Sequence, residues 1–260
     1  PDKILRILSS KEIKPFVKFV WGNHDILWMG AAAGNRSLIA EALRISFRYD
    51  NLVFVTRLGI DTTRLQEFAS RLYPDNVSGN FKAIEPLSRK IEKTLTMIQF
   101  KLEEQTIKKY PQLDMDSRLN LEKLAGMLKA GDMAGLTDTH FPTLNPDNPL
   151  ELTAEEREII DDLAEQFTGS LQIKRLMEFL FREGKLYHVH NFILNIHALI
   201  PSTADGQFDE LYGKKGKELL DYIEATVKDV GENYLNGNKQ EDFQLAVMFY
   251  LWCGPKSPFF

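Results

Sequence analysis

The chain has 260 residues, of which 43% are hydrophobic and 27% are charged, and its formal net charge is −5. This composition supplies enough apolar side chains for a core and excludes a largely disordered chain. The negative net charge counts against a broad surface for nucleic acid or for an anionic membrane, and no apolar run approaches the roughly 18 to 20 residues that cross a bilayer. The single cysteine, Cys253, permits no disulfide within the chain and favours a reducing, cytoplasmic compartment.

An apolar and aromatic run, IKPFVKFVW, covers residues 13–21 and ends at Gly22. Its β-branched and aromatic residues predict a buried strand. The chain then places Asn23, His24 and Asp25 side by side, and we expect them on the loop after that strand, where sheet proteins commonly carry their sites.

Apolar residues at helical spacing begin at Leu38 and dominate the middle of the chain. Residues 51–55 are expected as a short strand or a loop, and residues 138–149 as a loop. The predicted helices cover residues 38–48, 61–73, 87–102 and onward to Pro111, 121–130 before Gly131, 153–167 behind a capping Thr153, and 173–183 before Gly184.

At Leu186 the pattern changes to the β-rich stretch LYHVHNFILNIHALIP. Two strands of the core are expected there, followed by a turn at 204–208 and by helices around 219–227 and 243–252. Roughly 150 residues of helix and loop separate the two strand regions, which is too long for an ordinary connection. We therefore expect an α/β fold in which a large, mostly helical insertion covers the active site of a sheet-based core.

The three polar residues after the first predicted strand have the chemistry of a phosphoryl-transfer site. Asn23 offers a neutral hard ligand, His24 can donate a proton, and Asp25 can orient an imidazole or stabilise its charged form. The alternative is a polar turn with no role in chemistry. The apolar neighbours, Trp21 on one side and residues 26–29 on the other, favour a loop held against the core.

Other side chains carry weaker signals. His197 falls inside an apolar run, where an imidazole needs a hydrogen-bond partner or a metal. His188 and His190 share one face of a strand, either as a metal pair or, as we favour, as an exposed face.

Arg44 and Arg48 lie one helical turn apart and could hold an anionic substrate group. Cys253 is interpreted as a small buried hydrophobe, because no basic cluster is near it in the sequence.

Four stretches lie in order along the chain: WGNHDILWMGAAAG, IQFKLEEQTIKKYP, FPTLNPDNPLELTAEE and LWCGPKSPFF. Together they resemble the class III, Firmicutes-type fructose-1,6-bisphosphatases of the calcineurin-like metallophosphatase superfamily. The resemblance implies a partial metallophosphatase sandwich with a helical insertion. Residues 1–34 would form a core segment with the Asn-His-Asp loop, 35–184 the insertion, 185–208 core strands with a second metal-ligand histidine, and 209–260 a helical segment.

The resemblance also implies roles for individual residues. Asn23 and His197 would be metal ligands, His24 would contact the phosphoryl group and assist the leaving sugar oxygen, and Asp25 would orient His24. Ala198 follows His197 where the family usually has glycine. The early Asp-x-His and Gly-Asp-x-x-Asp-Arg motifs and the late Gly-His motif of the superfamily are absent, so we expect this chain to be an internal segment of a longer enzyme.

The resemblance implies a two-metal enzyme with manganese as the metal. Its activity would be hydrolysis of the 1-phosphate of fructose 1,6-bisphosphate to fructose 6-phosphate, a step of gluconeogenesis. The implied partner is this small sugar bisphosphate, with no nucleic acid or membrane and with a homo-oligomer left open. Two alternatives stand: a metallophosphatase for a phosphoprotein or nucleotide, and a non-catalytic helical module that binds through the stripe from Leu87 to Leu102. Two neutral ligands hold a metal pair poorly, so we expect the chain alone to have no appreciable phosphatase activity.

Overall fold

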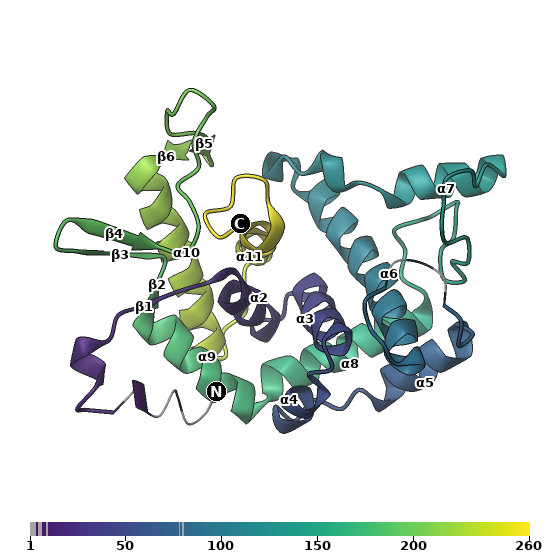
Figure 1. Ribbon diagram of the computed structural model, residues 1–260, viewed down its shortest axis with the longest axis horizontal. Helices are drawn as coiled ribbons and strands as arrows, with labels where there is room; N and C mark the ends of the chain where they lie inside the picture. The colour runs from purple at the N-terminus through teal and green to yellow at the C-terminus, as the bar shows by residue number, and fades with distance from the viewer. Residues whose placement is uncertain (1–3, 5–6, 9, 78, 80) are drawn as a thin grey trace. The chain divides into compact units, whose positions relative to one another are not determined.

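The computed structural model describes residues 4, 7–8, 10–77, 79 and 81–260. The chain divides into two compact units. We call residues 1–35 with 171–260 the terminal unit, and residues 36–170 the internal unit (Figure 1). Residues 171–184, which the sequence predicts as part of the insertion, therefore group with the terminal unit.

The elements of the terminal unit whose bounds are defined by described residues include four α-helices and six short strands. In chain order its elements are η1 (Lys14–Phe16), β1 (Phe19–Val20), α2 (Asn23–Ala32), α9 (Leu171–Glu183), β2 (Gly184–Lys185), β3 (Tyr187–His190), β4 (Ile193–Ile196), β5 (Glu210–Leu211), β6 (Lys214–Lys215), α10 (Gly216–Asn236) and α11 (Asp242–Cys253). Strand β1 pairs in parallel with β2, which joins the start of the chain to the end of α9. The later helices confirm those expected around 219–227 and 243–252.

The core of the terminal unit forms where α2 lies against α9 and α11, and α10 lies against α9 and α11. Helices α2 and α11 are apolar around most of their circumference, as expected for helices that are covered on several sides. Ile26, Leu27, Val247 and Phe249 are fully buried there. The first turn of α2 is thus continuous with a helix whose later residues are well packed.

The prediction of a buried strand over residues 13–21 is wrong. Lys14–Phe16 is a single 3₁₀ turn, and only Phe19–Val20 is a strand, with both residues half-buried. Pro15 explains part of the difference, because proline has no N–H for a strand ladder and its fixed φ suits the first turn of a helix. The polar residues that follow lie in the first turn of α2 and not on a loop.

Strands β3 and β4 form an antiparallel hairpin in which Tyr187 pairs with Ile196 and His190 with Ile193. Two strands in this stretch are therefore confirmed, but the expected burial is wrong, since Phe192 is 104% exposed and Ile193 64%. Asn191 and Phe192 have φ of 48° and 63°, the left-handed conformation of a tight hairpin turn. The expectation of burial failed because an apolar run does not reveal whether a second layer covers it.

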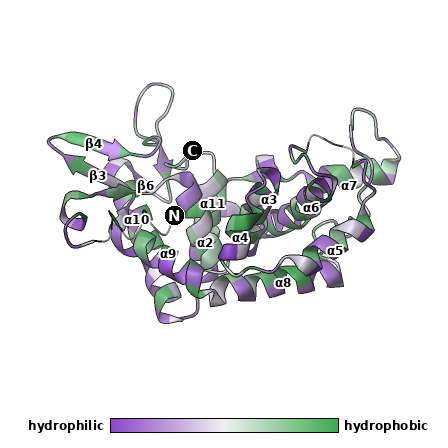
Figure 2. Cartoon of the chain, turned by 60° about the horizontal axis from the view of Figure 1, so that its bottom comes forward, coloured by the Kyte–Doolittle hydropathy of each residue, from purple (hydrophilic) through white to green (hydrophobic). Residues whose placement is uncertain are grey.

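The internal unit is helical wherever the structure assigns regular elements. These are α3 (Arg36–Arg48), α4 (Leu52–Arg57), α5 (Thr63–Leu72), α6 (Pro86–Lys109), η2 (Pro111–Leu113), η3 (Asp116–Arg118), α7 (Leu121–Ala130) and α8 (Ala154–Gly169). Hydrophobic and hydrophilic segments alternate along α5 and α8, as in helices with one buried face (Figure 2). The expected strand or loop at 51–55 is wrong, because that segment opens α4; the other helices of this unit are confirmed.

Helix α6 lies along α3 and also contacts α5 and α7, and charged residues on it are buried as well as apolar ones. Lys101 is fully buried and pairs with Glu156 at 2.7 Å, and its Nζ also donates to the carbonyl of Thr143 at 2.7 Å. Buried charges of this kind are tolerated when they are paired and hydrogen-bonded. The internal unit is therefore held by specific ion pairs as well as by apolar packing.

The fold class is confirmed at the coarse level: the chain is helix-rich with a few strands. Across the described residues, the named strands form three two-stranded sheets. None of the described helices combines the length and the apolar character that a bilayer crossing requires.

Candidate functional site

Trp21 fixes the position at which the Asn-His-Asp turn begins. Its backbone N–H donates to the carbonyl of Lys185 at 2.9 Å, and its buried indole Nε1–H donates to the carbonyl of Leu180 at 2.8 Å. A Cβ atom on Gly184 would lie 2.0 Å from the Trp21 Nε1 atom, so only glycine fits there. The Trp21 indole thus occupies the space that a side chain at position 184 would fill.

Lys228 on α10 completes this anchor. Its Nζ lies 5.1 Å from the centre of the Trp21 ring and donates to the carbonyls of Phe181 and Gly184, the latter at 2.7 Å. These carbonyls lie at the end of α9, where a cation is favourable. Burial lowers the pKa of Lys228 from its ordinary value. Sequence reasoning missed Trp21, Gly184 and Lys228 as positioning residues, and only the adjacency of Trp21 to the motif signalled one of them.

Gly22, Asn23, His24 and Asp25 form the beginning of helix α2. The Asp25 Oδ2 atom accepts the backbone N–H of Gly22 at 2.8 Å, and the Asn23 Oδ1 atom accepts the backbone N–H of His24 at 3.0 Å. A carboxylate at the third helical position that accepts from the N-cap N–H is one half of a reciprocal cap, and Gly22 has no side chain to form the other half. The helix dipole also favours negative charge at this end.

His24 is exposed, and its ring meets the ring of Trp252 edge to face at a centroid distance of 5.3 Å. Trp252 comes from α11, so the histidine is positioned by an element far along the chain. Sequence reasoning did not identify Trp252, and no local signal points to it. The imidazole is left open to solvent, where it can meet a substrate.

His197 lies beside the same turn. It follows β4 directly, and its Cε1 and Nδ1 atoms are 3.2 and 3.3 Å from the point that a Gly22 Cβ would occupy, while Asp25 Oδ2 is 3.5 Å from that point. The expectation that His197 is buried in a strand is wrong, because it is exposed. The structure nevertheless brings this histidine and the Asn-His-Asp turn together at Gly22.

The charges at the turn influence the carboxyl group of Asp25. Burial raises its pKa above the ordinary value, and the Gly22 N–H, His197 and His24 each oppose that change. The Asp25 carboxylate therefore accepts a hydrogen bond from the Gly22 N–H and interacts electrostatically with the His24 and His197 rings. Its hydrogen bond goes to the backbone N–H of Gly22, and the expected orientation of His24 by Asp25 stays a prediction.

Arg44 and Arg48 belong to the internal unit, whereas the Asn-His-Asp turn belongs to the terminal unit. Both belong to α3 of the internal unit, where Arg44 pairs with Glu41 at 2.6 Å and Arg48 with Glu92 at 2.6 Å. These carboxylates pair with the guanidinium groups, and the expected substrate-binding role of the two arginines stays a prediction.

Two other sequence candidates are placed as follows. His188 and His190 lie on one face of β3 with nearly parallel rings 6.4 Å apart, and His190 is exposed. Cys253 lies at the end of α11 and is half-buried, not buried as expected, with its Sγ 3.6 Å from the carbonyl of Phe249.

The donors at the turn suit a hard or borderline divalent cation, since they are an amide oxygen, a carboxylate and imidazole nitrogens. They do not form a complete ligand set. In the part of the chain that the structure describes, no three His, Cys, Asp or Glu side chains are grouped closely enough to hold a metal ion. Asn23 and His197 can contribute to a metal site but do not enclose one.

Comparison with known proteins gives a consistent result. A family model described as "Firmicute fructose-1,6-bisphosphatase" matches residues 1–260. A class 3 fructose-1,6-bisphosphatase of Lacticaseibacillus casei (strain BL23) is 37% identical over 279 residues, which cover 100% of this chain and 43% of that protein. One of Clostridium novyi (strain NT) is 38% identical over 263 residues, covering 94% of this chain and 39% of that protein. The chain thus spans about two fifths of the length of these curated relatives. No solved structure matches it.

Proposed function

Because the chain belongs to the Firmicute fructose-1,6-bisphosphatase family, we propose that the protein that contains it hydrolyses the 1-phosphate of fructose 1,6-bisphosphate. The products are fructose 6-phosphate and phosphate, and the step belongs to gluconeogenesis. The observation that carries the proposal is the position of His197, which lies against Gly22 although it is far from the Asn-His-Asp turn in the sequence.

Asn23 and His197 are the residues of this chain proposed to contact the metal ions, with manganese as the proposed metal. Bound divalent cations supply Lewis acidity at the phosphoryl group. The amide oxygen of Asn23 keeps a lone pair beyond its hydrogen bond with the His24 N–H, and His197 is accessible. The sandwich core that the family resemblance implies, and the ligands that this turn lacks, are proposed to come from the further length that the relatives have.

His24 is proposed to act on the leaving group. The exposed ring, in its protonated form, would donate a proton to the sugar oxygen at position 1 as a water oxygen bonds to phosphorus and the bond between phosphorus and the sugar oxygen breaks, which avoids an alkoxide leaving group. Asp25 is proposed to orient this ring, and its carboxylate holds Gly22 at the helix start by accepting the Gly22 N–H. Trp252 limits the directions in which the His24 ring can point.

The helical-module alternative predicts that one stripe of α6 is free to bind a partner. The structure counts against it, because Ile91, Leu95 and Ile98 of that stripe are fully buried within the internal unit. A phosphoprotein or nucleotide substrate has no specific support from the described side chains. The substrate, a cytoplasmic location and a possible homo-oligomer are proposals that follow from family membership.

The test measures manganese-dependent phosphate release from fructose 1,6-bisphosphate by a protein of the relatives' length that contains this chain. His24→Ala is expected to lower kcat by about 100-fold or more, the usual range for loss of a general acid. The matched control is His190→Ala on the exposed hairpin, which is expected to leave kcat unchanged. Faster turnover of a nucleotide or phosphoprotein than of the sugar would overturn the proposed substrate.

A second arm uses the chain of 260 residues alone. We expect no appreciable phosphate release from it, because Asn23 and His197 are too few ligands for a metal pair. Metal-dependent hydrolysis by this chain would contradict the proposed division of the ligands.

A further inference from the structure

The terminal unit contains a second feature with the chemistry of a ligand site: a pocket of about 500 Å³ between the segment before β1 and the end of α9. Its size falls within the range of small-molecule sites. Five cationic side chains and one carboxylate line it: Lys11, Lys14, Lys18, Arg182, Lys185 and Glu183. Among the described residues given roles at the Asn-His-Asp turn, Lys185 alone lines this pocket, and it serves the turn through its backbone carbonyl and not through its side chain.

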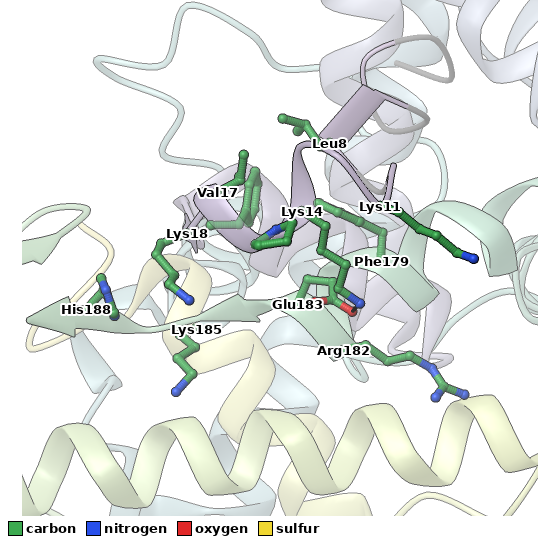
Figure 3. A pocket seen from close by; sticks show the side chains of 12 residues that line it. Leu8, Lys11, Lys14, Val17, Lys18, Phe179, Arg182, Glu183, Lys185 and His188 are labelled. Atoms are coloured by element: carbon green, nitrogen blue, oxygen red, sulfur yellow. Dashed lines mark hydrogen bonds and ion pairs between the residues drawn. The ribbon is translucent and has the colours of Figure 1, made fainter.

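The pocket carries a local excess of positive charge in a chain whose net charge is −5. Glu183 neutralises one cation through its ion pair with Lys14 at 2.8 Å. Arg182 pairs with Glu178 at 3.1 Å, but both side chains are exposed, so this contact is weak. For Lys18 and Lys185, no carboxylate lies within ion-pair distance among the described residues. Figure 3 shows Lys18, Lys185 and His188 on one flank of the pocket and Lys11 and Arg182 on the other.

A simpler explanation is that these cations only stabilise the end of α9, where backbone carbonyls carry partial negative charge. Lys228 already donates to the carbonyls of Phe181, Arg182 and Gly184 at that end. Lys11 and Lys18 come from a different segment. Capping of α9 therefore does not account for the basic residues that precede β1.

The remaining wall of the pocket is apolar. Val17, Phe19 and Phe179 line it, and the Phe19 and Phe179 rings pack edge to face at 5.6 Å. Lysine ammonium groups bind phosphate as point charges, and several cations around one cavity repel one another until an anion enters. An apolar wall beside them suits the carbon skeleton of a ligand.

We propose that this pocket binds a small phosphorylated organic anion, with Lys18 and Lys185 contacting the phosphate and Phe179 contacting the organic part. This site is additional to the proposed hydrolytic site and needs no metal. The exposed lysines make the interaction dependent on salt, because charges at the surface are screened by ions.

The test is calorimetric titration of the 260-residue chain in EDTA and low salt, with phenyl phosphate and inorganic phosphate as probes. Phenyl phosphate is expected to bind at one saturable site and more tightly than inorganic phosphate. Lys18→Glu combined with Lys185→Glu is expected to weaken binding at least about tenfold. The control reverses Lys174 and Lys239, two exposed lysines of the same unit that do not line the pocket.

Thermal unfolding of each variant without ligand shows whether it is folded. If the two charge-reversed pairs melt alike and both weaken phenyl phosphate equally, general attraction explains the binding and the proposal is overturned. Absence of saturable binding to the wild-type chain overturns it as well. Phe179→Leu provides a second arm that keeps all charges: it is expected to reduce the advantage of phenyl phosphate over inorganic phosphate, and an unchanged ratio contradicts the assignment of the apolar wall.

Discussion

Replacing Gly184 with alanine tests how the chain holds the start of α2. The added Cβ would lie 2.0 Å from Trp21 Nε1, 2.5 Å from Trp21 Cδ1 and 2.6 Å from the carbonyl oxygen of Leu180. The indole cannot remain in place at these distances. It must move, and its hydrogen bond with the Leu180 carbonyl must break.

Two costs determine the expected magnitude. Loss of one buried hydrogen bond costs about 0.5 to 1.5 kcal/mol, and overpacking of a well-packed site costs about 1 to 3 kcal/mol. We therefore expect Gly184→Ala to lower the free energy of unfolding of the terminal unit by about 1.5 to 4.5 kcal/mol. Urea unfolding followed by tryptophan fluorescence reports on this unit, because Trp21, Trp28 and Trp252 all lie in it.

Gly126→Ala is the matched control. Gly126 lies in α7 of the internal unit, and an added Cβ meets no atom within 4 Å. The change is expected to leave the fluorescence transition unmoved and to stabilise α7 by up to about 1 kcal/mol, since alanine is the better helix former. A change of less than about 0.5 kcal/mol for Gly184→Ala would refute the claim that a missing side chain makes room for the indole.

Three further substitutions have defined outcomes. Lys101→Met leaves the Glu156 carboxylate buried without its ion-pair partner, so the free energy of unfolding should fall by about 3 to 5 kcal/mol, measured by urea unfolding with circular dichroism. A fall below about 1 kcal/mol would contradict a stabilising buried ion pair. Burial raises the pKa of the Tyr234 hydroxyl in the folded protein to about 12. In the unfolded chain the same hydroxyl ionises near pH 10, so the free energy of unfolding of the wild type falls as the pH rises from about 10 to about 12. Tyr234→Phe removes that fall and should be more stable than wild type by about 1 kcal/mol at pH 11, whereas equal urea midpoints at pH 11 would contradict it. Arg48→Ala should lower the free energy of unfolding by about 1.5 to 3 kcal/mol, because its contact with Glu92 is lost. In the longer protein the same change should leave KM for the sugar bisphosphate unchanged. A raised KM would instead support a substrate-binding role for Arg48.

The helices could be predicted from the sequence because local residues determine where they begin and end. Thr153 caps α8 by accepting the Glu156 N–H, and Gly131 ends α7 with φ of 68°. These devices act within a few residues, so a sequence pattern is sufficient to find them.

The start of α2 shows where a local signal was available but misinterpreted. Asp25 three residues after Gly22 is the spacing of a helix cap, and the structure uses it as one. The preceding apolar run favoured a strand with a loop behind it. The polar trio therefore occupies the first turn of a helix.

Burial could not be predicted in the same way, because it depends on distant partners. The apolar residues around Phe192 are exposed. Lys101, in contrast, is buried, and its ammonium group donates to the Glu156 carboxylate and to the Thr143 carbonyl. The proximity of His197 to Gly22 also depends on long-range folding. The family resemblance anticipated it, and the spacing of residues did not.

The most direct test of the central claim is a double-mutant cycle on manganese-dependent turnover in a protein of the relatives' length that contains this chain. Asn23→Ala, His197→Ala and the double variant are compared with wild type, and circular dichroism confirms that each is folded. If both side chains serve one site, each single change lowers kcat strongly and the double variant loses little more than the worse single one. Wild-type turnover after His197→Ala, or losses that simply multiply, would contradict the account.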